Sequence, residues 1–160
     1  MSIFIAIKRS LGTRQRFGRR CVQGLTSPDT QMMTLVEAVA SFMETCDEKH
    51  LSDVFVVGSV TIIENFAPFI FSGCDAISDW KEGFRAHAEG LSDLCHTFGQ
   101  PQDFSSSEGA AFFTLPTVWT GRTVGLAFRE AGGWAFAFGQ QGLDWRIKGY
   151  GWAVTDFSFV

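Results

Sequence analysis

The stretch from residue 109 to residue 157 reads GAAFFTLPTVWTGRTVGLAFREAGGWAFAFGQQGLDWRIKGYGWAVTDF, and it decides the fold class. It holds four of the chain's five Trp residues and many Phe residues, and glycines divide it into long apolar runs. Aromatic runs bounded by glycine are typical of β-strands. Residues 33–91 instead show helical spacing. The sequence therefore predicts an α+β domain in which helices precede a curved, aromatic antiparallel sheet around a pocket.

Three helices are expected in the first half. The first spans residues 34–47, where one apolar stripe is formed by Leu35, Val39, Phe42, Met43 and Cys46. A short second helix is expected over residues 50–57. A third should run from a cap at Asp75 to about Leu91. Its inward stripe is predicted to contain Ile77, Trp80, Phe84, His87 or Ala88, and Leu91.

Strands are expected over residues 59–64, 94–98, 109–119, 128–138 and 144–157, and residues 102–107 either pair or loop. Residues 66–73 should form an irregular connection with extended pieces. Residues 120–126 should form a polar connection and residues 139–143 a hairpin loop. Pro116 inside a predicted strand indicates an edge position or a bulge. Bends are expected at Gly132-Gly133 and in the last strand.

Strand alternation divides the aromatic residues of the last two strands into two sets on opposite faces, unless a bulge at Gly149 or Gly151 shifts the register. The residues concerned are Trp134, Phe136, Phe138, Trp145, Ile147, Tyr150 and Trp152. One set should line the pocket. The other should cover the outer face of the sheet, where a partner would hide it. We therefore expect a homodimer.

Length and composition favour one domain, because 160 residues with 46% hydrophobic residues can fill a core. Residues 1–28 contain six Lys and Arg residues and no acid, so the remainder holds 7 basic against 17 acidic residues. Such an acidic domain is not expected to bind nucleic acid, and no membrane partner is expected. We expect residues 1–31 to be a basic N-terminal extension that is disordered or not native, with a natural start at Met32 or Met33. Residues 32–160 would then form the domain.

The four cysteines are far apart and form no CxxC pair, which favours free thiols in a reducing cytoplasm. Three scattered His residues provide neither HxH nor HExxH spacing. The sequence also lacks glycine-rich phosphate motifs with the required strand–helix context. Neither a metal nor a cofactor is expected.

Three groups of segments resemble the NTF2-like superfamily, the cone-shaped α+β fold of ketosteroid isomerases and SnoaL-type polyketide cyclases. They are residues 60–65 and 68–73 with the helix that carries Trp80 and Phe84; residues 115–120; and residues 133–138 with 145–147 and Trp152. The resemblance covers about residues 32–157. It implies three helices on a strongly curved antiparallel or mixed sheet. It also implies a hydrophobic pocket lined by Phe42, Asn65, Phe66, Trp80, Phe84, Trp119, Trp134 and Trp152.

Isomerases of this family abstract a proton next to a carbonyl group with a carboxylate near the end of the first strand. Glu64 or Asn65 matches this position. An apolar cone would raise the pKa of Glu64 toward a working value, whereas an exposed strand end would not. His87 can share a helix face with Trp80 and Phe84 and could act as an acid or base. Alternatively, Ala88 faces inward and His87 lies at the helix border.

The two acidic donors of the isomerases have no equivalents here. The family's Tyr falls near Phe42, which has no hydroxyl group, and its protonated Asp falls near Trp134, whose indole is a weaker acid. We therefore expect a protein that binds a small hydrophobic ligand and dimerises through its sheet without clear catalysis. The alternative is a cofactor-independent lyase, isomerase or cyclase that uses Glu64 and His87 as acid and base. That alternative requires the two side chains to meet in one cavity.

Overall fold

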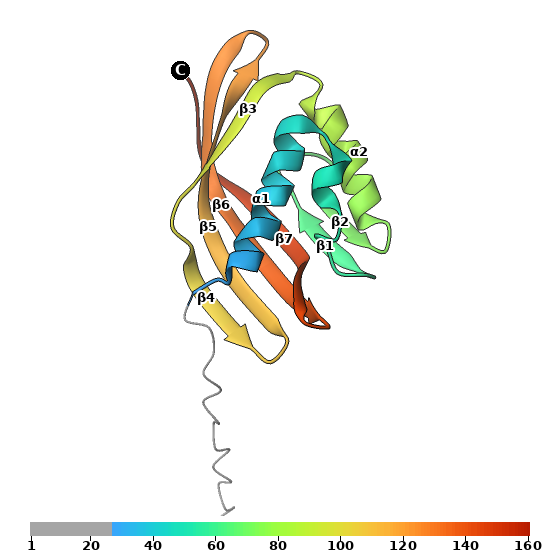
Figure 1. Ribbon diagram of the computed structural model, residues 1–160. Coiled ribbons are helices and arrows are strands. Elements are labelled where there is room, and N and C mark those ends of the chain that lie inside the picture. The colour runs from blue at the N-terminus through green and yellow to red at the C-terminus, as the bar shows by residue number, and fades with distance from the viewer. Residues whose placement is uncertain (1–26) are drawn as a thin grey trace, which may run out of the picture.

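The computed structural model describes residues 27–160. Long, strongly bent strands form a curved wall, and the helices lie on its concave side (Figure 1). The predicted α+β class with a curved mixed sheet is confirmed, although the described residues contain two α-helices rather than three. Of the predicted N-terminal extension, residues 1–31, the first 26 residues lie outside the described part of the chain. Residues 29–31 form the beginning of the first helix, so the folded part starts before Met32.

Helix α1 (Thr30–Thr45) begins four residues earlier than expected. Asp29 caps it by accepting a hydrogen bond from the backbone N–H of Gln31 at 2.8 Å. The helix ends at Cys46, which adopts a left-handed conformation with φ 55°. Its predicted stripe is buried apart from the half-buried Cys46, and Val39 and Phe42 are fully inaccessible. The helical period therefore identified the buried face correctly.

The predicted second helix is wrong in extent, because only a short 3-10 helix, η1 (Glu48–Leu51), forms. Phe55 instead forms an isolated parallel bridge with Ile147 of the last strand. The backbone of Ile147 accepts from Val56 N–H at 3.0 Å and donates to the carbonyl of Val54 at 2.9 Å. These long-range hydrogen bonds explain the error, since local spacing carries no information about Ile147.

Helix α2 (Ala76–Ala88) places Trp80 and Phe84 in the core. Asp75 occupies the cap position, but its side chain makes no capping hydrogen bond. Its backbone carbonyl instead accepts from Asp79 N–H at 3.0 Å. The predicted helix cap at Asp75 is therefore a backbone feature and not a side-chain cap.

The sheet has the strand order β2-β1-β7-β6-β5-β3, and β4 also pairs with β5. Its strands are β1 (Val60–Ile63), β2 (Ile70–Gly73), β3 (Leu91–Phe98), β4 (Gln102–Ser107), β5 (Ala110–Thr123), β6 (Leu126–Gln141) and β7 (Asp144–Phe159). Among the named strands of residues 27–160, β1 and β7 alone pair in parallel, and Phe55 adds an isolated parallel bridge to Ile147. This path has two ends, so the sheet is open and not a closed barrel.

Several strands are longer than expected, and the connections between them are correspondingly short. The predicted polar connection at 120–126 shrinks to a tight turn at Val124-Gly125, and the predicted hairpin loop at 139–143 to Gly142-Leu143. Pro116 lies where the partner of β5 changes from β3 to β4, because Thr117 pairs with Phe98 in β3 and Thr114 with Gln102 in β4. β5 is therefore not an edge strand. Between the β3 pairs and the β4 pairs, however, no partner needs a hydrogen bond from the backbone nitrogen of residue 116, so a proline is tolerated there.

A one-residue irregularity in β7 determines which side chains enter the core. Phe138 pairs with Ile147 and Ala137 with Gly149, so Lys148 is the extra residue of a bulge. The bulge brings Ile147, Tyr150 and Trp152 to the inner face. Gly149 is required here, because a Cβ would lie 2.4 Å from the carbonyl oxygen of Thr61 in β1.

The expected division into two aromatic faces does not occur, because the register shift expected as the alternative at Gly149 or Gly151 takes place at the neighbouring Lys148. Paired residues of β5, β6 and β7 that share the inner face are Phe113, Leu115, Trp119, Trp134, Phe136, Phe138, Ile147, Tyr150 and Trp152, and all are buried. The intervening outer positions of β6 are mostly small, such as Ala135 and Ala137. Phe112 is a large aromatic residue on the outer face of β5, at 39% exposure.

Candidate functional site

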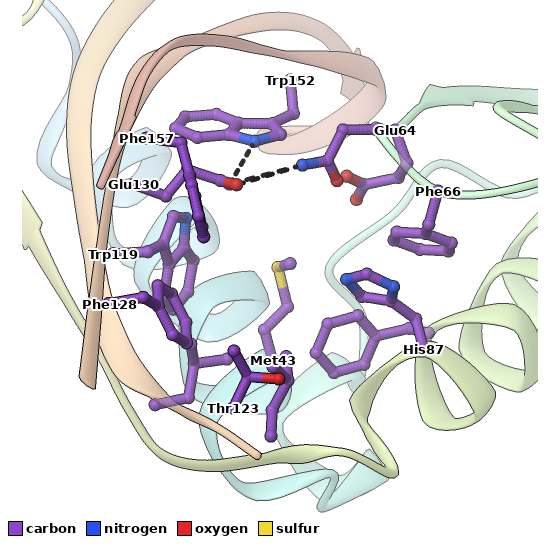
Figure 2. A pocket seen from close by; sticks show the side chains of 14 residues that line it. Met43, Glu64, Phe66, His87, Trp119, Thr123, Phe128, Glu130, Trp152 and Phe157 are labelled. Atoms are coloured by element: carbon purple, nitrogen blue, oxygen red, sulfur yellow. Dashed lines mark hydrogen bonds between the residues drawn. The ribbon is translucent and has the colours of Figure 1, made fainter. Parts of the chain in front are cut away.

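The site is a cavity of about 240 Å³ between the helices and the inner face of the sheet. Residues from α1, α2, the β1–β2 turn and strands β3, β5, β6 and β7 contribute to it (Figure 2). Its lining consists of Met43, Glu64, Asn65, Phe66, Phe84, His87, Leu91, Leu94, Trp119, Thr123, Phe128, Glu130, Trp152 and Phe157. Most of these side chains are apolar or aromatic. Two are carboxylates and one is an imidazole.

Glu64 follows β1 immediately and is 4% exposed. Its backbone N–H bonds the carbonyl of Phe69 at 2.9 Å, which closes the turn between β1 and β2. The side-chain Oε1 accepts hydrogen bonds from the hydroxyl of Tyr150 and, at 3.0 Å, from Nε1 of Trp80. The other oxygen, Oε2, is buried and has no protein partner among the described residues.

Burial raises the pKa of Glu64 to about 7, and the nearby charge of Glu130 adds to this effect. The hydrogen bonds from Tyr150 and Trp80 oppose the shift because they stabilise the ionised form. Burial is the main reason that the pKa of the Tyr150 phenol lies well above its ordinary value of 10.0, and the negative charge of Glu64 raises it further. Tyr150 is therefore a neutral donor near neutral pH, while Glu64 is divided between its two protonation states.

Glu130 is a second carboxylate that the sequence interpretation missed. It lies on the inner face of β6, where it pairs with Trp119 of β5 and Phe157 of β7. Its Oε1 accepts from Nε1 of Trp152 at 3.1 Å and from Nδ2 of Asn65 at 3.3 Å. Burial raises the pKa of Glu130 as well, against the effect of these two donors.

A signal for Glu130 was present in the sequence. Alternation along β6 gives residue 130 the same face as Trp134, Phe136 and Phe138. Extending that pattern toward the start of the strand would have identified Glu130 as an inward-facing acid.

His87 lines the same cavity from the last turn of α2 (Figure 2). Its ring stacks on Phe66, with 4.8 Å between ring centroids and an interplanar angle of 14°. Burial lowers the pKa of the imidazole, so the neutral form predominates at neutral pH. Ala88, the alternative inward residue, also packs partly against the core. His87 thus lies at the helix border and still reaches the cavity.

Three side chains expected in the pocket lie in the core instead. Phe42, Trp80 and Trp134 are each fully buried and do not line the cavity. Phe42 packs on Trp80 at 5.1 Å, and Trp134 lies within 6 Å of Trp119, Tyr150 and Trp152. The reason is that these large side chains fill the space between helices and sheet themselves. The other expected pocket residues, Asn65, Phe66, Phe84, Trp119 and Trp152, do line it.

The remaining His residues lie elsewhere. His96 joins β3 to α1 through contacts of its ring with Glu44 at 2.6 Å and Glu37 at 3.3 Å, and His50 is exposed in η1. Among residues 27–160, no cluster of three or more His, Cys, Asp or Glu side chains could hold a metal ion. Within the same range, no helix is long and apolar enough to cross a membrane.

Comparison with known proteins shows the fold. No protein-family model matches the sequence, and no curated protein matches it at a significant level. Solved structures do match. A hexachlorocyclohexane dehydrochlorinase, LinA-type3 from Novosphingobium barchaimii, is 10% identical, with a TM-score of 0.69 over 81% of this chain and 88% of that one.

Two further structures cover similar shares. An NTF2-like superfamily protein from Salmonella enterica is 14% identical, with a TM-score of 0.64 over 79% of this chain and 90% of its own. A candidate ketosteroid isomerase from Shewanella frigidimarina is 15% identical, with a TM-score of 0.62 over 78% and 96%. The resemblance inferred from sequence is thus confirmed at the level of fold, and the chain has the NTF2-like cone.

Proposed function

We propose that this protein binds a small, mainly hydrophobic molecule in the cavity described above. The observation that carries the proposal is a cavity of about 240 Å³ that remains between helices and sheet even though large aromatic side chains fill the core around it. Aromatic walls with a few polar groups that converge on one space are the usual form of a small-molecule site. Glu64, Glu130 and His87 are these polar groups.

A matched pair of Leu→Trp variants tests this proposal. The neutral fluorescent probe N-phenyl-1-naphthylamine serves as ligand, and its emission reports binding. Leu94→Trp puts an indole into the cavity and should weaken probe binding at least about tenfold, or about 1.4 kcal/mol. Leu143→Trp places the same side chain in an exposed turn, where Leu143 is 93% exposed, and should leave binding unchanged. Equal binding by wild type and Leu94→Trp would show that the probe does not use this cavity.

A second candidate function is cofactor-independent acid–base catalysis as a lyase, isomerase or cyclase. The specific observation in its favour is that Glu64 and His87 line one cavity, where burial raises the pKa of Glu64 to about 7. A carboxylate with a pKa near the working pH is an effective proton acceptor. Glu64 would act as base and His87 as acid or orienting group. The structural neighbours named above include a dehydrochlorinase and a candidate ketosteroid isomerase, which agrees with proton chemistry in such a cone.

Proton exchange distinguishes catalysis from binding alone. The protein is incubated with the hydrophobic ketone β-tetralone in D₂O, and deuterium uptake next to the carbonyl is followed by NMR. Catalysis predicts exchange faster than in buffer, with loss of the acceleration in Glu64→Gln. Glu108→Gln, in an exposed turn remote in sequence from the cavity residues, is the control. Acceleration that persists in Glu64→Gln would remove Glu64 from the reaction.

Dimerisation through the outer face of the sheet completes the proposal. Support comes from a shallow, mainly apolar depression on that face, formed by Thr61, Phe112, Ala135, Ala137, Lys148, Gly149 and Tyr150. Small residues let two sheets approach closely. A monomeric mass by light scattering at micromolar concentration would contradict it.

A further inference from the structure

The polar groups of the cavity differ in what they can still bond. Four side chains already donate hydrogen bonds to the two carboxylates. Trp80 and Tyr150 donate to Glu64, and Trp152 and Asn65 donate to Glu130. What remains on the carboxylates, when Glu64 is ionised, is acceptor capacity. Oε2 of Glu64 is buried without a protein partner, on a side chain that is only 4% exposed. A buried oxygen of this kind is costly to leave unpaired. The cavity therefore calls for a ligand that brings hydrogen-bond donors.

The charges around the cavity point the same way. Among residues 27–160, no Lys or Arg lines it, although two glutamates do. The described basic side chains nearest in sequence are engaged elsewhere: Lys81 and Arg85 with Glu48, Arg122 with the carbonyl oxygen of Gly125, and Arg129 with Asp156. Burial lowers the pKa of His87, so the imidazole brings no compensating positive charge at neutral pH. Nothing in the lining would neutralise a carboxylate or phosphate ligand, whereas a cation would neutralise the glutamates.

The walls suit a cation as well. Aromatic rings carry negative charge on their faces, and a cation close to a ring face is attracted by about 0.5–2 kcal/mol. Rings that line the cavity beside the glutamates are those of Phe66, Phe84, Trp119, Phe128, Trp152 and Phe157. In Figure 2 the carboxylates of Glu64 and Glu130 both face the space that these rings surround.

We infer that the ligand class is a small hydrophobic amine, bound as its ammonium ion. The ammonium N–H groups would bond the carboxylates of Glu64 and Glu130, and the hydrocarbon part would lie among the aromatic rings. This inference rests on the proposed binding function of the cavity and adds the chemistry of the ligand to it. Anionic ligands of the same size would be rejected.

Binding of an ammonium ion must be linked to the ionisation of Glu64. A cation binds the ionised carboxylate, so the complex releases a proton wherever free Glu64 is protonated. For a pKa of about 7, the observed affinity should rise about tenfold between about pH 6 and about pH 8. An alkylammonium group stays protonated across this range, so the ligand itself adds no pH dependence.

Three probes that share one phenyl ring and a two-carbon chain test the inference: phenethylamine, phenethyl alcohol and phenylpropanoate. Each competes with N-phenyl-1-naphthylamine for the cavity, and calorimetry in two buffers of different ionisation enthalpy measures proton release. Phenethylamine should bind at least about tenfold more tightly than the alcohol at about pH 8. Phenylpropanoate should not compete. Only phenethylamine should release protons.

Variants assign the effect to residues. Glu64→Gln keeps an acceptor for Tyr150 and Trp80 but removes one of the two negative charges, so it should weaken the preference for the amine and remove the pH dependence that Glu64 contributes. Glu108→Gln should retain both. If the alcohol binds as tightly as the amine, the amine inference is wrong while ligand binding stands. If neither the reporter nor any probe binds, the proposed binding function itself is wrong.

Discussion

Replacing Glu64 with Gln should change how the stability of the protein depends on pH. Burial raises the pKa of Glu64 to about 7 from an ordinary value of 4.5. At about 1.4 kcal/mol per pKa unit, ionising this buried carboxyl opposes folding by about 3 kcal/mol. Because the folded-state pKa is the higher one, the folded protein holds a proton that the unfolded chain has lost. Stability is therefore fully present below about pH 4.5 and falls as pH rises to about 7.

Urea unfolding of wild type and Glu64→Gln, followed by Trp fluorescence, measures this effect. The difference between the two free energies of unfolding isolates Glu64 from other groups that titrate in the same range. Relative to wild type, Glu64→Gln should gain up to about 3 kcal/mol between about pH 5 and about pH 8, with an unchanged m-value. Gln can still accept from Tyr150 and Trp80, so the packing around residue 64 is retained.

The outcome that refutes this reasoning is a difference between the two proteins that stays constant with pH. Such a result would mean that Glu64 titrates alike in the folded and unfolded chain, and that water reaches its carboxyl group freely. Glu108→Gln, in an exposed turn, serves as the control for the loss of one acid.

Three further predictions follow from contacts in the structure. Tyr150→Phe removes a donor to Glu64, so it should raise the pKa of that carboxyl further, as seen by ¹³C NMR titration, and cost about 1–2 kcal/mol of stability. Gly132→Ala should destabilise the protein by more than about 2 kcal/mol, because the added Cβ would lie 2.2 Å from the carbonyl oxygen of Ala153. Gly133→Ala is the control. An added Cβ there meets nothing within 4 Å, so this variant should be close to neutral in the same urea assay. Ala137→Glu places a charge on the outer face and should halve the mass by light scattering if the dimer forms there.

The sequence was most informative where a short-range period controls burial. The spacing of Val39, Phe42 and Met43 identified the inner face of α1, and alternation placed Trp134 and Phe136 together. It was less informative where one residue changes the register. The bulge at Lys148 moved Tyr150 and Trp152 to the same face as Ile147, and no local pattern fixes the position of such a bulge.

In the site, too, the sequence identified some residues but not their surroundings. Glu64 and His87 were identified from sequence, and the structure places both at one cavity. Their environment was not predictable, since the donors to Glu64 come from Trp80, 16 positions away, and Tyr150, 86 positions away. Side chains such as Phe42 and Trp134 could have lined a pocket or filled the core. Only three-dimensional packing shows that they fill it.

The filled core determines where a ligand can place its polar end. The resemblance to ketosteroid isomerases implies a Tyr near the position of Phe42 and an acid near that of Trp134 as the donors to a substrate oxygen. Here both positions are fully buried and hold apolar rings, and Nε1 of Trp134 has no protein partner. The charged groups of the cavity lie instead on Glu64 and Glu130, and Asn65, His87 and Thr123 are its other polar side chains. A ligand that directs its polar group toward the two glutamates meets acceptors when Glu64 is ionised, and a carbonyl oxygen would then find no donor on either carboxylate. The same cone thus favours a ligand of opposite hydrogen-bonding character, one that donates.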